Sequence, residues 1–196
     1  NAVYILKNED LLRKTHLLRA SHFFNYKNYE VGPHQTIPTV STLEELRSAV
    51  ESSASNEMDD VIIVAAGTYS AQEGDSYLIE LQESEGYGLT ITSDEGLVVL
   101  DGGGIAQVLN VAASSNFSFT LKEVTVVNGV ETSGAGGAVF DVKSLRLEGV
   151  RFENNAGGAV YIYGDYSKGE QVEIIDSHFE GNTGKPAFRQ DGYYSP

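Results

Sequence analysis

The feature that most constrains this sequence is a unit of about 27 residues that is written roughly three times. "LEGVRFENN" (147–155) is followed by "IIDSHFEGN" (174–182), so Phe152 and Phe179 are 27 residues apart, as are Asn155 and Asn182. "LKEVTVVNG" (121–129) fits the same frame, with Val126 placed 26 residues before Phe152, and "GGAV" occurs at 136–139 and 157–160. A period of this length predicts a solenoid, in which each unit buries its apolar face only against its neighbours.

Short β-forming segments fill the repeat and no long helical pattern separates them. They are 61–69, two within 88–104, then 107–111, 117–121, 124–127, 138–142, 145–147, 150–152, 159–163 and 172–175. Their shortness and the absence of intervening helices argue against a βαβ sheet, and a sandwich would need longer strands joined by tight hairpins. The pattern favours a parallel β-helix, in which each coil contributes three strands that pair one coil away, about 4.8 Å along the axis.

The recurring Asn and Phe residues have structural roles in such a coil. Asn and Gly tolerate the left-handed backbone that corners need, so we expect Asn128, Asn155 and Asn182 to stack at equivalent corners as a hydrogen-bonded ladder. Phe152 and Phe179 are expected to stack inside the coil.

Residues 1–40 stand outside the repeat and are interpreted as an N-terminal extension. "AVYIL" (2–6) predicts a strand, residues 8–24 predict a helix with an apolar stripe, and residues 25–38 read as irregular chain. A second helix is predicted at 41–55, with Ser41 and Glu44 as its capping box. This helix would cap the β-helix, and residues 41–196 would form one domain.

Residues 40–69 resemble the entry segment of the pectin-lyase-like parallel β-helix superfamily, where a capping helix precedes a strand of the type I-x-V-x-x-G-x-Y. Ile63, Val64, Gly67 and Tyr69 match that pattern. "FENN", "FEGN" and "GGAV" are similar to the FxxN and GGA[ILV] repeats of polymorphic outer-membrane proteins and other β-helical adhesins. The resemblance implies an all-β fold, a right-handed single-stranded parallel β-helix with an N-terminal capping helix. It does not select a function, because the superfamily contains lyases, hydrolases, adhesins and tailspikes.

Charge and composition narrow the range of partners. The 196 residues carry a formal charge of −15, which argues against nucleic acid and anionic membrane surfaces. There is no Cys, so disulfides and thiolate metal sites are excluded, and no apolar run is long enough to insert into a membrane. The chain begins with Asn and shows no signal peptide, which suggests a processed product or an excised segment. Asn116 begins a glycosylation sequon.

Few residues are candidates for chemistry. Lyases of the resembled superfamily need a Lys or Arg base beside a group that neutralises a uronate, and Arg146 and Arg151 lie five residues apart in one coil. The alternative is that both are exposed strand charges that discourage edge aggregation. A Ca²⁺ site would have to come from Asp165, Glu170, Glu173 and Asp176, which lack loop spacing, so no metal or other cofactor is assigned.

Two further groups, a pair of Asp residues and a cluster of Tyr residues, are candidates for the surface or the core. Asp59 and Asp60 precede the first strand of the repeat region, where we expect both to face water. Tyr161, Tyr163 and Tyr166 crowd the C-terminal third and would contact a carbohydrate or partner if they point outward, or belong to the core if they point inward.

The sequence leaves three functional hypotheses. The first is a non-catalytic extracellular or cell-surface β-helix with a structural or adhesive role, which contacts itself, another surface protein or a polysaccharide. Its N-terminal extension would either fold back over its own β-helix, the favoured alternative, or add to a neighbour's strand edge and so assemble copies head to tail. The second is a polysaccharide lyase or hydrolase of the pectin-lyase-like class. The third is a carbohydrate-binding module without chemistry. We favour the first, because no acid–base or metal constellation stands out.

Overall fold

The structure is a computed structural model that describes residues 34–113, 116–132, 134–163, 171–184 and 188–191. These residues all belong to one compact unit, 32–196. The strand predicted at 2–6 and the helix predicted at 8–24 lie outside the described residues.

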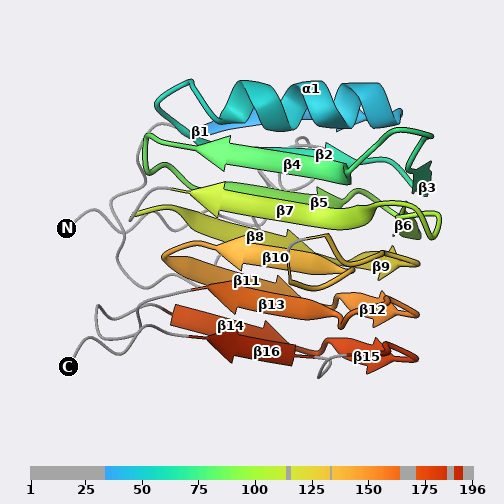
Figure 1. The fold of residues 1–196 in the computed structure, drawn as a ribbon. Coiled ribbons are helices and arrows are strands. Elements are labelled where there is room, and N and C mark those ends of the chain that lie inside the picture. The colour runs from blue at the N-terminus through green and yellow to red at the C-terminus, as the bar shows by residue number, and fades with distance from the viewer. Residues whose placement is uncertain (1–33, 114–115, 133, 164–170, 185–187, 192–196) are drawn as a thin grey trace, which may run out of the picture. The chain divides into compact units, whose positions relative to one another are not determined.

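Three parallel sheets run along the unit and together form a β-helix (Figure 1). The first sheet, sheet A, has the order β1(His34–Val40), β2(Asp59–Val64), β5(Leu89–Ser93), β8(Ser118–Lys122), β11(Ser144–Glu148) and β14(Gln171–Ile175). Sheet B contains β3(Gly67–Ser70), β6(Val98–Asp101), β9(Val124–Val127), β12(Arg151–Glu153) and β15(His178–Glu180). Sheet C contains β4(Tyr77–Glu83), β7(Gln107–Ala113), β10(Ala138–Asp141), β13(Val160–Tyr163) and β16(Phe188–Asp191). The predicted parallel β-helix fold is confirmed.

The interior of the β-helix is a continuous apolar core. In β8 the side chains of Phe119 and Leu121 point inward and are buried, whereas Ser118 is exposed and Thr120 is partly exposed. Phe119 packs against Phe140 across the interior, with ring centroids 5.4 Å apart. Burying each such side chain contributes about 1.5–3 kcal/mol, so stacking coils stabilises what one coil alone cannot.

Single left-handed residues turn the chain at two corners of the coil. Between sheets A and B these are Glu123, Gly149 and Asp176, with φ of 54°, 62° and 48°. After sheet B they are Asn128, Asn154 and Gly181, with φ of 52°, 56° and 65°. In these three coils each corner uses one such residue, and the strands on either side keep the same register from coil to coil.

Helix α1(Leu43–Ser53) covers one end of the core (Figure 1). Its buried face includes Leu46, Ala49 and Val50, and Arg47 ties it to the first coil through the Leu78 carbonyl at 2.8 Å. The capping box is formed by Thr42 and Glu45, one residue later than predicted. Ser41 instead donates through its hydroxyl to the Glu45 carboxylate at 3.0 Å, so it supports the cap without being the cap residue.

The strand predictions need three corrections. Residues 34–38, predicted as irregular chain in the N-terminal extension, belong to strand β1, which pairs with β2. Residues 61–69, predicted as one strand, contain parts of β2 and β3, because the chain turns a corner between Val64 and Gly67. Strands β4 and β16 were not predicted.

Candidate functional site

Two Asn side chains clamp successive coils together at the corner after sheet B. The side-chain oxygen of Asn155 accepts from the Gly129 N–H at 2.9 Å, and its amide donates to the Val126 carbonyl at 3.1 Å. Asn182 repeats the arrangement one coil later, where it accepts from the Asn155 N–H at 3.0 Å and donates to the Phe152 carbonyl at 2.8 Å. Each Asn therefore satisfies backbone groups of the preceding coil at a point where the strands have ended.

Asn128 does not belong to this clamp. The strand register pairs Val126 with Phe152, which places Asn128 opposite Asn154 and Gly129 opposite Asn155. Asn128 is thus a left-handed corner residue, and its amide donates to Asp101 Oδ1 at 3.0 Å in the preceding coil. The prediction that Asn128 and Asn155 occupy equivalent positions is therefore wrong by one residue. The corner has two successive positions: Asn128 and Asn154 occupy the first, and Gly129 and Asn155 occupy the second.

Phe152 and Phe179 lie directly over one another inside the β-helix. They are register partners in β12 and β15, and their rings are parallel, with centroids 5.3 Å apart and an interplanar angle of 7°. Phe152 is fully buried, whereas Phe179 is half-buried, because it belongs to the last coil that the structure describes. Both residues are part of the core.

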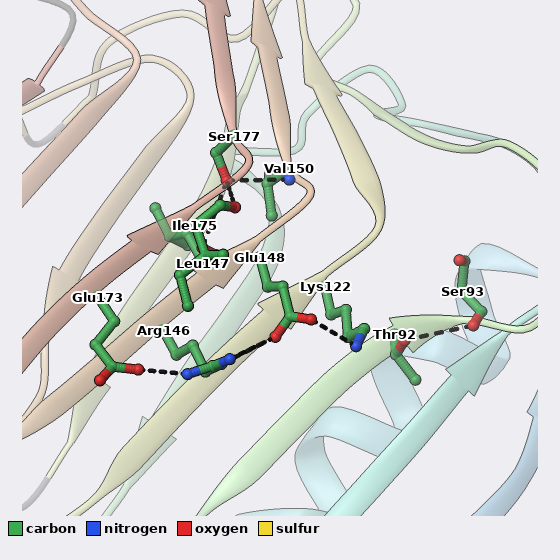
Figure 2. A network of polar contacts seen from close by, with 10 residues as sticks. All are labelled: Thr92, Ser93, Lys122, Arg146, Leu147, Glu148, Val150, Glu173, Ile175 and Ser177. Carbon is green, nitrogen blue, oxygen red and sulfur yellow. Dashed lines mark hydrogen bonds and ion pairs between the residues drawn. The ribbon is translucent and has the colours of Figure 1, made fainter. Parts of the chain in front are cut away.

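Arg146 lies in a row of charged side chains on the outer face of sheet A (Figure 2). Its guanidinium contacts Glu148 at 2.8 Å and also pairs with Glu173, and Glu148 contacts the Lys122 ammonium at 2.8 Å. Lys122 has only 7% of its side chain exposed. The row therefore alternates in sign from β8 to β14, and no cation in it stands apart from a carboxylate.

These contacts determine the ionisation of the row. Burial raises the pKa of the Glu148 carboxyl, but hydrogen bonds and charges from Lys122 and Arg146 together outweigh it, so that the pKa is lowered overall. The hydrogen bond to Glu148 raises the pKa of Arg146, which stays protonated. A general base must be unprotonated near the working pH so that it can accept a proton, whereas these contacts keep the Arg146 guanidinium protonated.

Arg151 lies apart from this row, on the exposed side of β12 in sheet B. Its guanidinium donates to Glu153 on the same strand at 2.7 Å. Although Arg146 and Arg151 are close in sequence, the corner at Gly149 separates them onto two sheets. The structure does not bring them together as one site.

Tyr161 and Tyr163 point out of the β-helix on sheet C. Val160 and Ile162, between which Tyr161 lies, belong to the core cluster, and the two tyrosine rings meet edge to face at 4.4 Å on the opposite side of the strand. Tyr161 is nevertheless only 8% exposed, because it packs with Ala135 and Val139 in a second apolar cluster. Tyr163 is half-buried at the edge of that cluster.

Polar residues also lie on the outer face that carries Tyr163. Asp141 is its register partner on β10 and is exposed. Farther along the face, the Asn110 amide on β7 donates to the Glu80 carboxylate on β4 at 3.4 Å, and these two residues are register partners. An aromatic ring edge next to a carboxylate, with an amide and a second carboxylate two and three strands away on the same face, is chemistry that suits a sugar or a polar peptide.

The prediction that Asp60 faces water is wrong, because this side chain is buried. It points inward with Ile62 and Val64 and is 2% exposed, whereas Asp59 is exposed as expected. Its Oδ2 accepts from the Asn56 amide at 2.7 Å, and its Oδ1 has no hydrogen-bond partner among the described residues. Burial raises the pKa of the Asp60 carboxyl. Its strand parity with Ile62 and Val64 was the signal that could have found it.

The remaining candidates give no built site. Asn116 is exposed in the turn before β8, so its sequon is accessible. Tyr166, Asp165 and Glu170 lie outside the described residues, and Glu173 is engaged by Arg146. Within the described part of the chain, no group of three or more His, Asp or Glu side chains has the arrangement to hold a metal ion.

Comparison with known proteins adds no assignment. No protein-family model matches this chain, and no curated protein and no solved structure is significantly similar to it. None of the helices in the described residues is long and apolar enough to cross a membrane.

Proposed function

We propose that this chain is a non-catalytic β-helix protein of the cell surface or extracellular space, with a structural or adhesive role. The main support is that the two Arg residues considered as catalytic bases are both paired with carboxylates and do not lie together. Arg146 is engaged by Glu148 and Glu173, Arg151 by Glu153, and the two lie on different sheets. A β-helix with paired outer charges is suited to present a regular, stiff surface rather than a reactive group.

The outer face of sheet C around Tyr163 is the surface proposed to contact a ligand. Tyr163 is half-buried beside the exposed Asp141, and Glu80 and Asn110 lie farther along the same face. Polysaccharides bind through stacking on aromatic rings combined with hydrogen bonds to carboxylates and amides. This arrangement also favours the second candidate function, a carbohydrate-binding module of the pectin-lyase-like class.

The proposal is tested with the full chain and a panel of polysaccharides that includes uronic-acid polymers. We expect retention on at least one polymer, and we expect Tyr163→Ala to weaken it about tenfold, a loss of about 1.4 kcal/mol. Tyr87→Ala is the matched control, since Tyr87 is 37% exposed and lies outside sheet C. Equal retention of both variants would show that the sheet C face is not the contact surface.

The enzyme alternative has a separate readout. The same polymers are incubated with the chain, with and without Ca²⁺, and chain shortening is followed by size. We expect no shortening under either condition. Product formation that Arg151→Ala or Arg146→Ala abolishes would overturn the non-catalytic proposal and favour a lyase.

A further inference from the structure

The end of the β-helix opposite α1 exposes core positions. Val172 and Ile174 on β14 are the register partners of Leu145 and Leu147. The two leucines are 1% and 0% exposed, whereas Ile174 is 39% exposed and Val172 is partly exposed. Phe179 shows the same contrast with Phe152. The inward side chains of the last described coil thus form an apolar end face made of Val172, Ile174 and Phe179.

The backbone of this coil also lacks the support that earlier coils receive. Asn155 clamps the coil of Val126, and Asn182 clamps the coil of Phe152. No described residue clamps the coil of Phe179 in the same way, and β14 and β15 are the last strands of sheets A and B. Among the described residues no further strand pairs with β14 or β15, so the end face combines open strand edges with an apolar surface, the combination that strand addition uses.

The rim of the end face is acidic. Glu173, Asp176 and Glu180 are exposed around it, and Glu180 contacts His178 at 3.1 Å. The outer side of α1 at the other end of the unit carries the exposed Glu44 and Glu51. Two copies that met directly, by either pair of ends, would bring like charges together, so a stable contact needs a basic element between them.

Residues 1–31 have that composition. Residues 1–31 contain five Lys and Arg against three Asp and Glu. Of the chain's 13 Lys and Arg and 28 Asp and Glu, residues 32–196 therefore contain 13 − 5 = 8 basic and 28 − 3 = 25 acidic residues. The same 31 residues include "AVYIL" (2–6) followed directly by Lys7, and the apolar pairs Leu11-Leu12 and Leu17-Leu18. A basic, apolar segment thus accompanies a strongly acidic β-helix in one chain.

We propose that the apolar end face binds residues 1–31 of a second copy of this chain. The inference rests on the structural role proposed above and names its partner. The predicted strand 2–6 would add to the edge of β14 or β15, its apolar residues would cover Ile174 and Phe179, and the basic residues would face the acidic rim.

The position of β1 favours a second copy over the same copy. The described chain begins with β1, which lies at the α1 end of the unit 32–196, and β14–β16 lie at the opposite end (Figure 1). A segment that precedes β1 in the chain would need to cross only the boundary between two stacked copies to reach the neighbour's end face, whereas the end face of its own copy lies a whole β-helix away from β1. A contact between unlike ends extends into a filament when it does not close into a ring.

The absence of Cys allows a direct test by crosslinking. Full-length copies carrying Ile5→Cys are mixed with full-length copies carrying Gln171→Cys, and a short bis-maleimide is added. We expect a crosslinked dimer only in the mixture. A crosslink between two Gln171→Cys copies would show a symmetric end-to-end contact, and a crosslink confined to single chains of the double variant at high dilution would show that the segment binds its own copy; either overturns the proposal.

A point variant tests the same face by size. Ile174→Glu places a charge at the centre of the end face and is expected to weaken association at least about tenfold in sedimentation velocity, because the buried charge would lack a partner. Ile105→Glu is the control, since Ile105 is 52% exposed and lies outside the last coil. Circular dichroism confirms that both variants fold. A monomeric full-length chain at all concentrations, or equal association of the two variants, contradicts the proposal, whereas polysaccharide retention through Tyr163 would be unaffected by either result.

Discussion

Asn182 accepts two hydrogen bonds from Asn155, one from the backbone N–H at 3.0 Å and one from the side-chain amide at 2.9 Å. The two residues belong to adjacent coils and meet where the strands of sheet B have ended. The side-chain amide thereby continues the coil-to-coil hydrogen bonding through a corner that strand pairing cannot reach. Asn155 is fully buried, so its polar atoms have to be satisfied by protein groups.

Replacing Asn155 by Ala should lower the free energy of unfolding by about 2–4 kcal/mol. The substitution leaves the buried Gly129 N–H and Val126 carbonyl without their partner, and each such group costs about 1–3 kcal/mol. Urea denaturation measures the loss. Asn110→Ala, which removes only a 3.4 Å contact to Glu80 on the outer face, is the control and should cost much less. Equal losses for the two variants would show that the clamp contributes nothing specific.

Asn154 tests the corner itself rather than the clamp. Its φ of 56° places it in the left-handed region, and Gly181 occupies the same corner in the next coil. Asn154→Gly should change stability by less than about 1 kcal/mol, whereas Asn154→Val should cost about 1–3 kcal/mol through backbone strain. Thermal melts compare the two variants. A Val variant as stable as the Gly variant would contradict the assigned corner conformation.

Asp60→Asn should stabilise the protein at neutral pH. Because burial raises the pKa of Asp60 in the folded state, the folded protein binds this proton more tightly than the unfolded chain. The stability from this group is complete below the ordinary pKa of 3.8 and is lost as the pH rises through the folded-state value. We expect a gain of about 1 kcal/mol at pH 7 and a smaller decline of stability above pH 4.

The control for this variant is Asp94→Asn, at an exposed Asp. It should leave the stability at neutral pH close to that of the unsubstituted chain, because no buried contact is lost. The measurement is urea denaturation at a series of pH values. A pH profile that is the same for Asp60→Asn as for the unsubstituted chain would show that Asp60 does not titrate differently on folding.

Glu148→Gln should have the opposite pH signature. The pKa of Glu148 is lowered in the folded state, so its contribution is present above the ordinary pKa of 4.5 and is lost as the pH falls through the folded-state value. At pH 7 the substitution should cost about 1–3 kcal/mol, because the 7% exposed Lys122 loses a carboxylate 2.8 Å away.

Glu153→Gln is the matched control for Glu148→Gln. Glu153 is exposed to the same degree, at 25% against 26%, but its partner Arg151 is 50% exposed. An exposed pair contributes about 0–1 kcal/mol, so this variant should be nearly neutral. Denaturation at pH 7 in low and high salt compares them. A larger loss for Glu153→Gln would contradict the burial that distinguishes the two pairs.

Much of the fold followed from local pattern. The frame of Phe152 and Phe179 predicted their stacking because a stack of short parallel strands repeats once per coil, and in this part of the chain coil length hardly varies. Strand β4 was missed because coil length elsewhere does vary. Val139 pairs with Tyr161, 22 residues later, and Gly67 pairs with Val98, 31 residues later. Connections of unequal length hide the period without disturbing the strands they join.

The amino-acid sequence by itself determined that the chain forms stacked coils, that Phe152 and Phe179 lie inside them, and that a helix precedes the repeat region. Only the tertiary structure decided which corner position Asn128 occupies, that Arg146 and Arg151 part onto different sheets, and that Tyr161 points outward yet is covered by Ala135. The physical reason is the distance along the chain over which each interaction acts. Strand alternation and apolar period act between neighbours along the chain, whereas these three outcomes depend on the residues that successive coils and their connections bring together in space.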